Sequence, residues 1–176
     1  MNKGFFVAVI ALIVGLCSFI FTMVSRPKTG FVQLSAVYEN FAMKKEYELK
    51  LKKVVDTRKS ALDSMEFHLR NLAGRIEQLK ETDPDRKIKI EEFELAKQDF
   101  LLKKKNYLED NENVTQQYES EIWKQINQYV SDYGKEKGYT YIYGAEGTGS
   151  MMYGKSEEDI TDLVKVYLND KYKGIK

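Results

Sequence analysis

The chain has 176 residues, with 28 Lys and Arg against 27 Asp and Glu, and a formal net charge of +1. This balance argues against a dedicated nucleic-acid binder, which usually carries a large basic excess, and against an acidic disordered tail protein. The single cysteine, Cys17, excludes an intramolecular disulfide, and with a single histidine, His68, we expect no Cys/His zinc site.

The N-terminal region contains a run of uncharged, mostly apolar residues that begins at Phe5 and ends at Val24. At about 1.5 Å per residue, a helix of this length spans about 30 Å, the thickness of a bilayer's hydrocarbon core. No Ala-x-Ala-like cleavage site follows the run. We therefore predict that residues 1–29 form an uncleaved signal anchor and linker, with a cleaved signal peptide as the alternative.

The next segment, residues 36–81, shows a coiled-coil pattern. Its apolar residues fall on 3,4 spacing over about four heptads, which is typical of a helix with a narrow apolar seam. Arg58 is the one charged member of this seam, and Ser35 is the expected N-cap. The pattern predicts one helix of about 70 Å. The seam consists of Leu51, Val55, Leu62, Met65, Leu69, Leu72, Ile76 and Leu79.

A turn at residues 82–85 separates this helix from a second one. Pro84 disfavours helix at the residue before it and suits the first turn of a new helix. The second seam is less regular, because Lys97 and Lys104 interrupt it, and the helix is expected to end near Gly134 or Gly138. We predict an antiparallel hairpin over residues 36–133 with its tip near 82–86. The second seam consists of Phe93, Phe100, Tyr107 and Val114.

Short β patterns flank the hairpin, at residues 30–35, 139–143 and 150–153, with 144–149 as a loop between the last two strands. Ser156 is expected to cap a final helix, with Asp159 in a capping-box position. The apolar face of that helix consists of Ile160, Leu163, Val164, Tyr167 and Leu168. Residues 30–35 and 134–176 are too small to form a stable core alone. We therefore expect a shared oligomerisation body, with the number of chains left open.

One stretch, residues 149–156, matches the phosphate-binding pattern G-x-x-x-x-G-K-[ST]. No surrounding nucleotide-binding fold is recognisable, so we interpret it as a strand, a turn at Gly154 and a helix cap at Ser156. His68 is interpreted as a surface residue, and Trp123 and Tyr118 as packing residues. We expect no enzyme, catalytic residues, metal, cofactor, nucleotide or nucleic acid.

The order of these parts resembles the OmpH/Skp family of periplasmic chaperones. The resemblance covers about residues 30–172 and is carried by FVQLSAVYENF at 31–41, the hairpin, and GYTYIYGAEGTGSMMYGKSEEDITDLVKVYLND at 138–170. It implies a homotrimer whose strands form a central body, with hairpins around a cavity that holds unfolded outer-membrane proteins without ATP. The matching body positions are Val32, Leu34, Tyr141, Ile142, Met151, Tyr153, Ile160, Leu163 and Val164. The chain departs from the well-known basic members in its near-neutral charge, and from their cleaved signals in its anchor-like N-terminus.

The expected fold class is α+β: a long antiparallel coiled-coil hairpin projecting from a small β-rich oligomerisation body, after a transmembrane or signal segment. The main functional hypothesis is a holdase on the periplasmic side of the inner membrane, or soluble in the periplasm after cleavage. The alternative is an anchored coiled-coil scaffold or spacer. Apolar residues such as Phe67, Phe93 and Leu101 facing a cavity would favour the holdase, and a continuous polar surface would favour the spacer.

Overall fold

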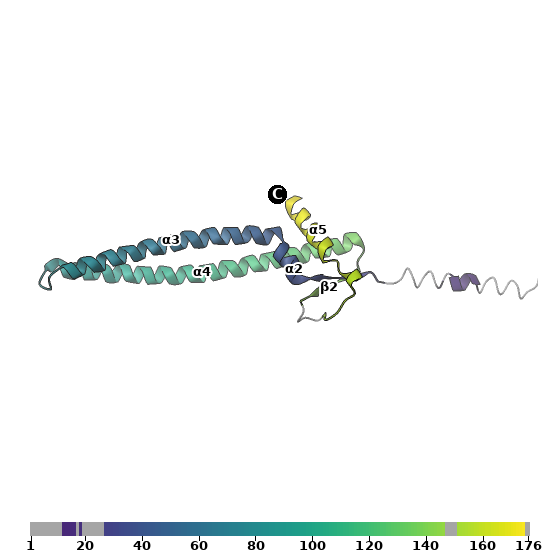
Figure 1. The fold of residues 1–176 in the computed structure, drawn as a ribbon, viewed down its shortest axis with the longest axis horizontal. Helices are drawn as coiled ribbons and strands as arrows, with labels where there is room; N and C mark the ends of the chain where they lie inside the picture. The colour runs from purple at the N-terminus through teal and green to yellow at the C-terminus, as the bar shows by residue number, and fades with distance from the viewer. Residues whose placement is uncertain (1–11, 17, 19–26, 147–150, 175–176) are drawn as a thin grey trace, which may run out of the picture. The chain divides into compact units, whose positions relative to one another are not determined.

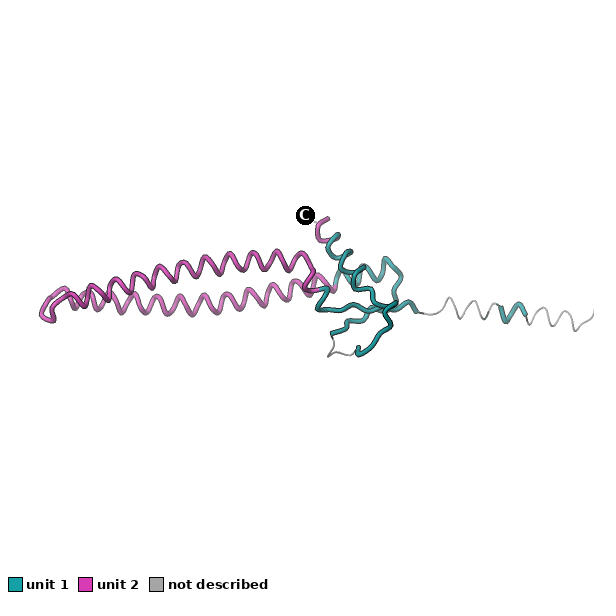
Figure 2. The backbone as a smooth tube through the Cα atoms, in the orientation of Figure 1, with its two compact units in different colours: residues 1–37, 128–170 teal, residues 38–127, 171–176 magenta. Residues whose placement is uncertain are grey.

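The computed structural model describes residues 12–16, 18, 27–146 and 151–174, and it is mostly helical with one small sheet (Figure 1). The chain divides into two compact units (Figure 2). Unit 1 comprises residues 1–37 and 128–170, and unit 2 comprises residues 38–127 and 171–176. The elements are β1 (Thr29–Gln33), α2 (Leu34–Asn40), α3 (Ala42–Gln78), α4 (Pro84–Lys137), β2 (Tyr141–Ala145), the 3-10 turn η1 (Ser156–Glu158) and α5 (Thr161–Gly174).

The predicted membrane segment, residues 5–24, lies mostly outside the described residues, and only its residues 12–16 and 18 are described, as helix. Within the described ranges, no helix is both long enough and apolar enough to span a bilayer. The anchor therefore stays a prediction.

The hairpin predicted for the middle of the chain is present in unit 2, where α3 and α4 run side by side (Figure 1). Pro84 is the first residue of α4, as its position after the polar turn predicted. At the turn, the Asp83 carboxylate accepts a 2.9 Å hydrogen bond from the backbone N–H of Asp85. Arg86 donates to the carbonyl of Leu79, just beyond the end of α3. These bonds satisfy backbone groups that a helix end leaves without intrahelical partners.

The C-terminal end of α4 agrees with one of the two predicted positions. The helix ends at Lys137, and Gly138 has a φ of +69°. This left-handed conformation is strained for a residue with a Cβ and is the usual conformation just after a helix.

The prediction of one continuous helix over residues 36–81 is wrong. The first helix, α2, begins at Leu34, so Ser35 lies inside it. The helical structure is then interrupted at Phe41, before α3 begins. Phe41 has an extended backbone, with φ −76° and ψ 128°, and its side chain is 1% exposed. Its ring packs edge-on against Tyr172, with centroids 5.5 Å apart. The break thus accompanies the burial of Phe41, and no Pro or Gly marks it in the sequence.

The sheet of unit 1 has two parallel strands, β1 and β2, in a register that places Phe31 opposite Tyr143. The whole hairpin connects them, and such a long crossover permits parallel pairing. On the chain that follows η1, the N–H of Ile160 donates to the carbonyl of Phe31 at 2.9 Å. The N–H of Gln33 donates to the Thr161 hydroxyl, also at 2.9 Å. β1 is therefore bonded to β2, to Ile160 just before α5 and to Thr161, the first residue of α5.

The predicted third strand and its hairpin loop are wrong in the residues that are described. Residues 151–155 have no strand structure, and Gly144 and Ala145 belong to β2 rather than to a loop; residues 147–150 lie outside the described ranges. The alternating pattern at 139–143 predicted a strand but not its partner. That partner, β1, is more than 100 residues away in sequence, so local turn signals misled the pairing.

The predicted helix cap at Ser156 is also wrong. Ser156 begins η1, and α5 begins at Thr161. The Asp159 carboxylate accepts the N–H of Thr161 at 2.9 Å and also the hydroxyl of Thr161. Burial alone would raise the pKa of Asp159, but the hydrogen bonds from Thr161 and Gln33 outweigh it and hold the pKa below its usual value.

The core of unit 1 lies between the sheet, α4 and α5. Its buried side chains include Val32, Tyr133, Val164 and Leu168, of which Val164 is fully buried. Gly30 allows a close approach, since a Cβ there would lie 3.0 Å from Ile160 Cδ1 and from the Tyr139 ring. This core is small, and most of its apolar contacts come from residues distant in sequence.

Candidate functional site

Most residues of the predicted coiled-coil seam are partly buried in the structure. Leu72 is buried, with 2% of its surface exposed, whereas Val55 is 36% exposed. The other predicted seam residues are half-buried: Leu51, Leu62, Met65, Leu69, Ile76, Leu79, Phe93, Phe100, Tyr107 and Val114. Such partial exposure is expected for a two-helix interface, which leaves each seam residue open at its sides.

Arg58, the charged member of the seam, makes a polar layer between the arms. Its guanidinium donates to the Asn111 side-chain oxygen and to Asp110, the latter at 3.4 Å. It also lies 5.3 Å from the centre of the Tyr107 ring. These contacts satisfy a charged group that would be costly to leave unpaired between two helices.

Lys97 and Lys104, which interrupt the predicted seam of α4, lie beside it and cover aromatic faces. The ammonium of Lys97 is 5.9 Å from the centre of the Phe93 ring, and that of Lys104 is 6.0 Å from the centre of the Phe100 ring. Each pair is four residues apart on the same helix face. Both lysines are exposed, and each ammonium lies near the ring of the seam residue four positions before it.

Other large apolar side chains of both arms remain in solvent. Their exposed fractions range from 54% to 69%. Phe67 and Leu101, expected off the seam, belong to this set, whereas Phe93 is half-buried beneath Lys97. We call the set the outer apolar positions: Leu49 and Phe67 on α3, and Ile88, Leu95, Leu101, Leu102 and Leu108 on α4.

The predicted body residues divide between the interior and the surface of unit 1. Val32, Ile160 and Val164 are buried, and Leu34, Ile142 and Met151 are half-buried. Tyr141, Tyr143, Tyr153 and Leu163 are exposed by 50% to 82%, and the rings of Tyr141 and Tyr143 stack 6.1 Å apart. Leu163, expected on the apolar face of the last helix, is 59% exposed in the single chain, so its place in a shared oligomerisation body stays a prediction. Among its described residues, unit 1 thus presents an exposed apolar and aromatic surface.

The structure also contains an aromatic cluster between α2, α3 and α4 in unit 2. Tyr38 stacks on Trp123 at 5.0 Å, and Tyr47 lies 4.2 Å from Tyr118. The sequence had indicated Trp123 and Tyr118 as packing residues but not their partners. Burial, together with the hydrogen bond that Tyr47 donates to Glu121 at 2.8 Å, raises the pKa of Tyr47 to about 12.

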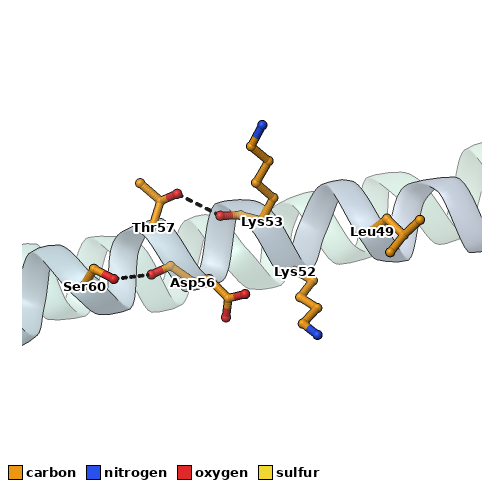
Figure 3. Close-up of a pocket in the computed structure, with 6 residues that line it drawn as sticks. All are labelled: Leu49, Lys52, Lys53, Asp56, Thr57 and Ser60. Carbon is orange, nitrogen blue, oxygen red and sulfur yellow. Dashed lines mark hydrogen bonds between the residues drawn. The ribbon is translucent and has the colours of Figure 1, made fainter.

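A shallow groove along α3 carries no recognisable chemistry. It is lined by residues of that one helix, including Leu49, Lys52 and Asp56 (Figure 3). Its two hydroxyls are bonded to the helix backbone: Thr57 donates to the Lys53 carbonyl and Ser60 to the Asp56 carbonyl. Binding pockets are usually concave and closed by more than one element. This groove is an open helix face.

The phosphate-binding pattern at residues 149–156 is not followed directly by an α-helix. Lys155 is exposed and precedes η1, and α5 starts only at Thr161. A phosphate cradle uses a loop that leads straight into a helix N-terminus. Among the described residues, no cluster of three or more His, Cys, Asp or Glu side chains is arranged to hold a metal ion.

Comparison with known proteins places this arrangement of strand, hairpin and terminal helix in a family. No curated protein matches the chain significantly. Among solved structures, it is similar to a candidate outer membrane chaperone, OmpH-like, from Caulobacter crescentus CB15, with a TM-score of 0.70 and 13% identity over 84% of this chain and 86% of that one. At this identity the likeness concerns the fold. Residues 28–168 match the family model "Outer membrane protein (OmpH-like)", and the chain therefore belongs to the OmpH-like family.

Proposed function

We propose that this protein is an ATP-independent holdase of the bacterial envelope that binds unfolded outer-membrane proteins between its helical hairpins. The observation that carries the proposal is the set of outer apolar positions, which leaves seven large side chains on the two arms in contact with solvent. Membership of the OmpH-like family and the likeness to the Caulobacter protein support a chaperone role.

The arrangement of the outer apolar positions suits a client without fixed shape. They are spread along both arms and are interspersed with charged residues, so each offers a small apolar contact rather than a shaped pocket. Many weak and adaptable contacts favour promiscuous binding. Exposed apolar side chains also allow a holdase to work by burial alone, without nucleotide hydrolysis.

The proposed assembly is a homotrimer formed through unit 1. The support is the uncovered surface that includes Tyr141, Tyr143, Met152 and Tyr153, each at least 50% exposed. Aromatic side chains are enriched at protein interfaces, and large exposed apolar patches mark interaction sites. The proposed location is the periplasm, with the N-terminal segment as an inner-membrane anchor.

The second candidate function is an anchored coiled-coil spacer. The seam and its Arg58 layer would serve a spacer equally well. A spacer, however, needs a polar outer surface, and Phe67 at 66% and Leu95 at 66% exposure do not suit that role.

The proposed holdase function is tested by whether the protein suppresses the aggregation of an unfolded client. The full chain, purified in lipid nanodiscs, is mixed with an unfolded β-barrel protein, and light scattering follows aggregation with empty nanodiscs as the control. A holdase keeps the client soluble at near-stoichiometric amounts without ATP. Aggregation at the rate seen with empty nanodiscs would exclude the holdase and leave the spacer.

A further inference from the structure

A cleft of about 270 Å³ lies within unit 2, between the start of the hairpin arms. Its lining includes one predicted seam residue, Leu51, and none of the outer apolar positions. Its walls combine phenol rings with charged groups, which is the composition of a site for a cationic side chain. These rings and charged groups belong to Tyr38, Lys44, Tyr47, Glu48, Tyr118 and Glu119.

Two lysines of the chain already lie over tyrosine rings of the cleft. The Lys50 ammonium lies 5.2 Å from the centre of the Tyr47 ring and pairs with Glu46 at 2.9 Å. The Lys44 ammonium lies 5.2 Å from the centre of the Tyr38 ring and makes ion pairs with Glu39 at 2.6 Å and Glu48 at 2.9 Å. Its side chain is only 14% exposed. Hydrogen bonds to both carboxylates raise the pKa of Lys44, so it is charged at neutral pH. The aromatic wall therefore accepts a positive charge.

A further carboxylate, Glu119, lines the same cleft beside Tyr38. Burial raises the pKa of Tyr38, and the charge of Glu119 raises it further. Glu119 is itself exposed to solvent. No lysine or arginine in the described part of the chain pairs with Glu119 within ion-pair distance. Lys44 is shared by Glu39 and Glu48, and Lys50 is paired with Glu46. Glu119 therefore adds a further negative charge to the cleft that Tyr47 and Tyr118 line.

We propose that this cleft binds an arginine side chain of an extended polypeptide, with the guanidinium against the tyrosine rings and paired with Glu119. Arginine fits better than lysine, because a planar guanidinium stacks on aromatic faces and pairs with a carboxylate through two hydrogen bonds. That the polypeptide is an unfolded client rests on the proposed holdase function. The cleft would then give the hairpin one preferred contact among many nonspecific ones.

The chain contains a built-in reporter for this test. Trp123 is the only tryptophan, and its ring stacks on Tyr38 at 5.0 Å. The full chain is titrated with the blocked tripeptide Gly-Arg-Gly, and the fluorescence of Trp123 is recorded. The same peptide with citrulline, a neutral isostere of arginine, and the same peptide with lysine are the comparison probes. We expect a saturable change with the arginine peptide, weaker binding of lysine and little change with citrulline.

Two variants locate the binding. Glu119→Gln removes the charge but keeps the shape, and should weaken the arginine peptide about five-fold, as expected for a partly exposed ion pair. Glu112→Gln is the matched control, since Glu112 is exposed and lies seven residues earlier on the same face of α4. Tyr118→Leu should also weaken binding by removing a ring. Equal binding of arginine and citrulline peptides, or equal effects of Glu119→Gln and Glu112→Gln, would overturn the assignment.

The peptide titration is independent of the aggregation assay. Arginine-selective binding by a chain that does not suppress aggregation would support the cleft and reject the holdase. Suppression of aggregation without arginine-selective binding would support the holdase and reject the cleft.

Discussion

Replacing three outer apolar residues of α4 should weaken client binding without unfolding the protein. Ile88, Leu95 and Leu102 lie seven residues apart, on one side of the helix, and are 60%, 66% and 59% exposed. The perturbation is the triple variant Ile88→Ser, Leu95→Ser and Leu102→Ser. Because the side chains face solvent, they contribute little to the folded state and are available to a client.

The expected magnitude follows from the exposed area. Fully burying a side chain of this size stabilises by about 1.5–3 kcal/mol, so the exposed parts represent about 1–2 kcal/mol each, or about 3–6 kcal/mol in total. If a client buries only a quarter of that area, binding loses about 1 kcal/mol, which is about five-fold in affinity. The loss should appear as a higher chaperone concentration for half-maximal suppression of aggregation.

A matched control variant is Glu91→Ser, Gln98→Ser and Lys105→Ser. These residues are also exposed, lie on α4 and are seven apart, and their replacement leaves the net charge unchanged. Both variants place three serines in the helix, with a similar propensity cost of below about 1.5 kcal/mol. Urea unfolding followed by circular dichroism should show similar midpoints. Equal suppression by both variants would refute the assignment of client binding to the outer apolar positions.

Three further predictions concern the fold. Leu72→Ala, at the most buried seam position, should cost about 2–5 kcal/mol in urea unfolding, whereas Leu49→Ala, at a 69% exposed position, should cost less than about 0.5 kcal/mol; similar costs would contradict the seam. Hydrogen exchange should be fast at residues 78–92, which have few buried contacts, and slow at 118–126, which include the buried Ile122 and Ile126; mass spectrometry showing uniform protection would argue against this difference. The pKa of Asp159 is lowered in the folded state, so its carboxylate stabilises the fold at pH values above 3.8, the pKa of the unfolded chain, and this contribution is lost as the pH falls below 3.8. The stability of Asp159→Asn to urea should therefore depend less on acid pH than that of the parent chain. An unchanged acid profile would show that the hydrogen bonds to Thr161 and Gln33 contribute little.

The hairpin was predictable because its signals are local. Heptad spacing, the polar turn and Pro84 each act within a few residues, and they indicated the two arms and the position of the tip, whereas the individual seam residues stay a prediction. The helix C-terminus at Gly138 follows from the conformational freedom of glycine in the same way. Local signals could not give the break at Phe41, because that break accompanies the burial of Phe41 against Tyr172, a residue far along the chain.

Tertiary structure decided the pairing in unit 1 and the composition of the sites. The alternation at residues 139–143 fixed a strand, but only packing made it parallel to β1 rather than antiparallel to residues 150–153. Periodicity likewise gave an apolar face to the last helix, yet Leu163 lies outside and Val164 inside, since the orientation of a helix depends on what covers it. The aromatic cleft joins Tyr47 to Tyr118 across the hairpin, and such a contact exists only once the two arms have packed.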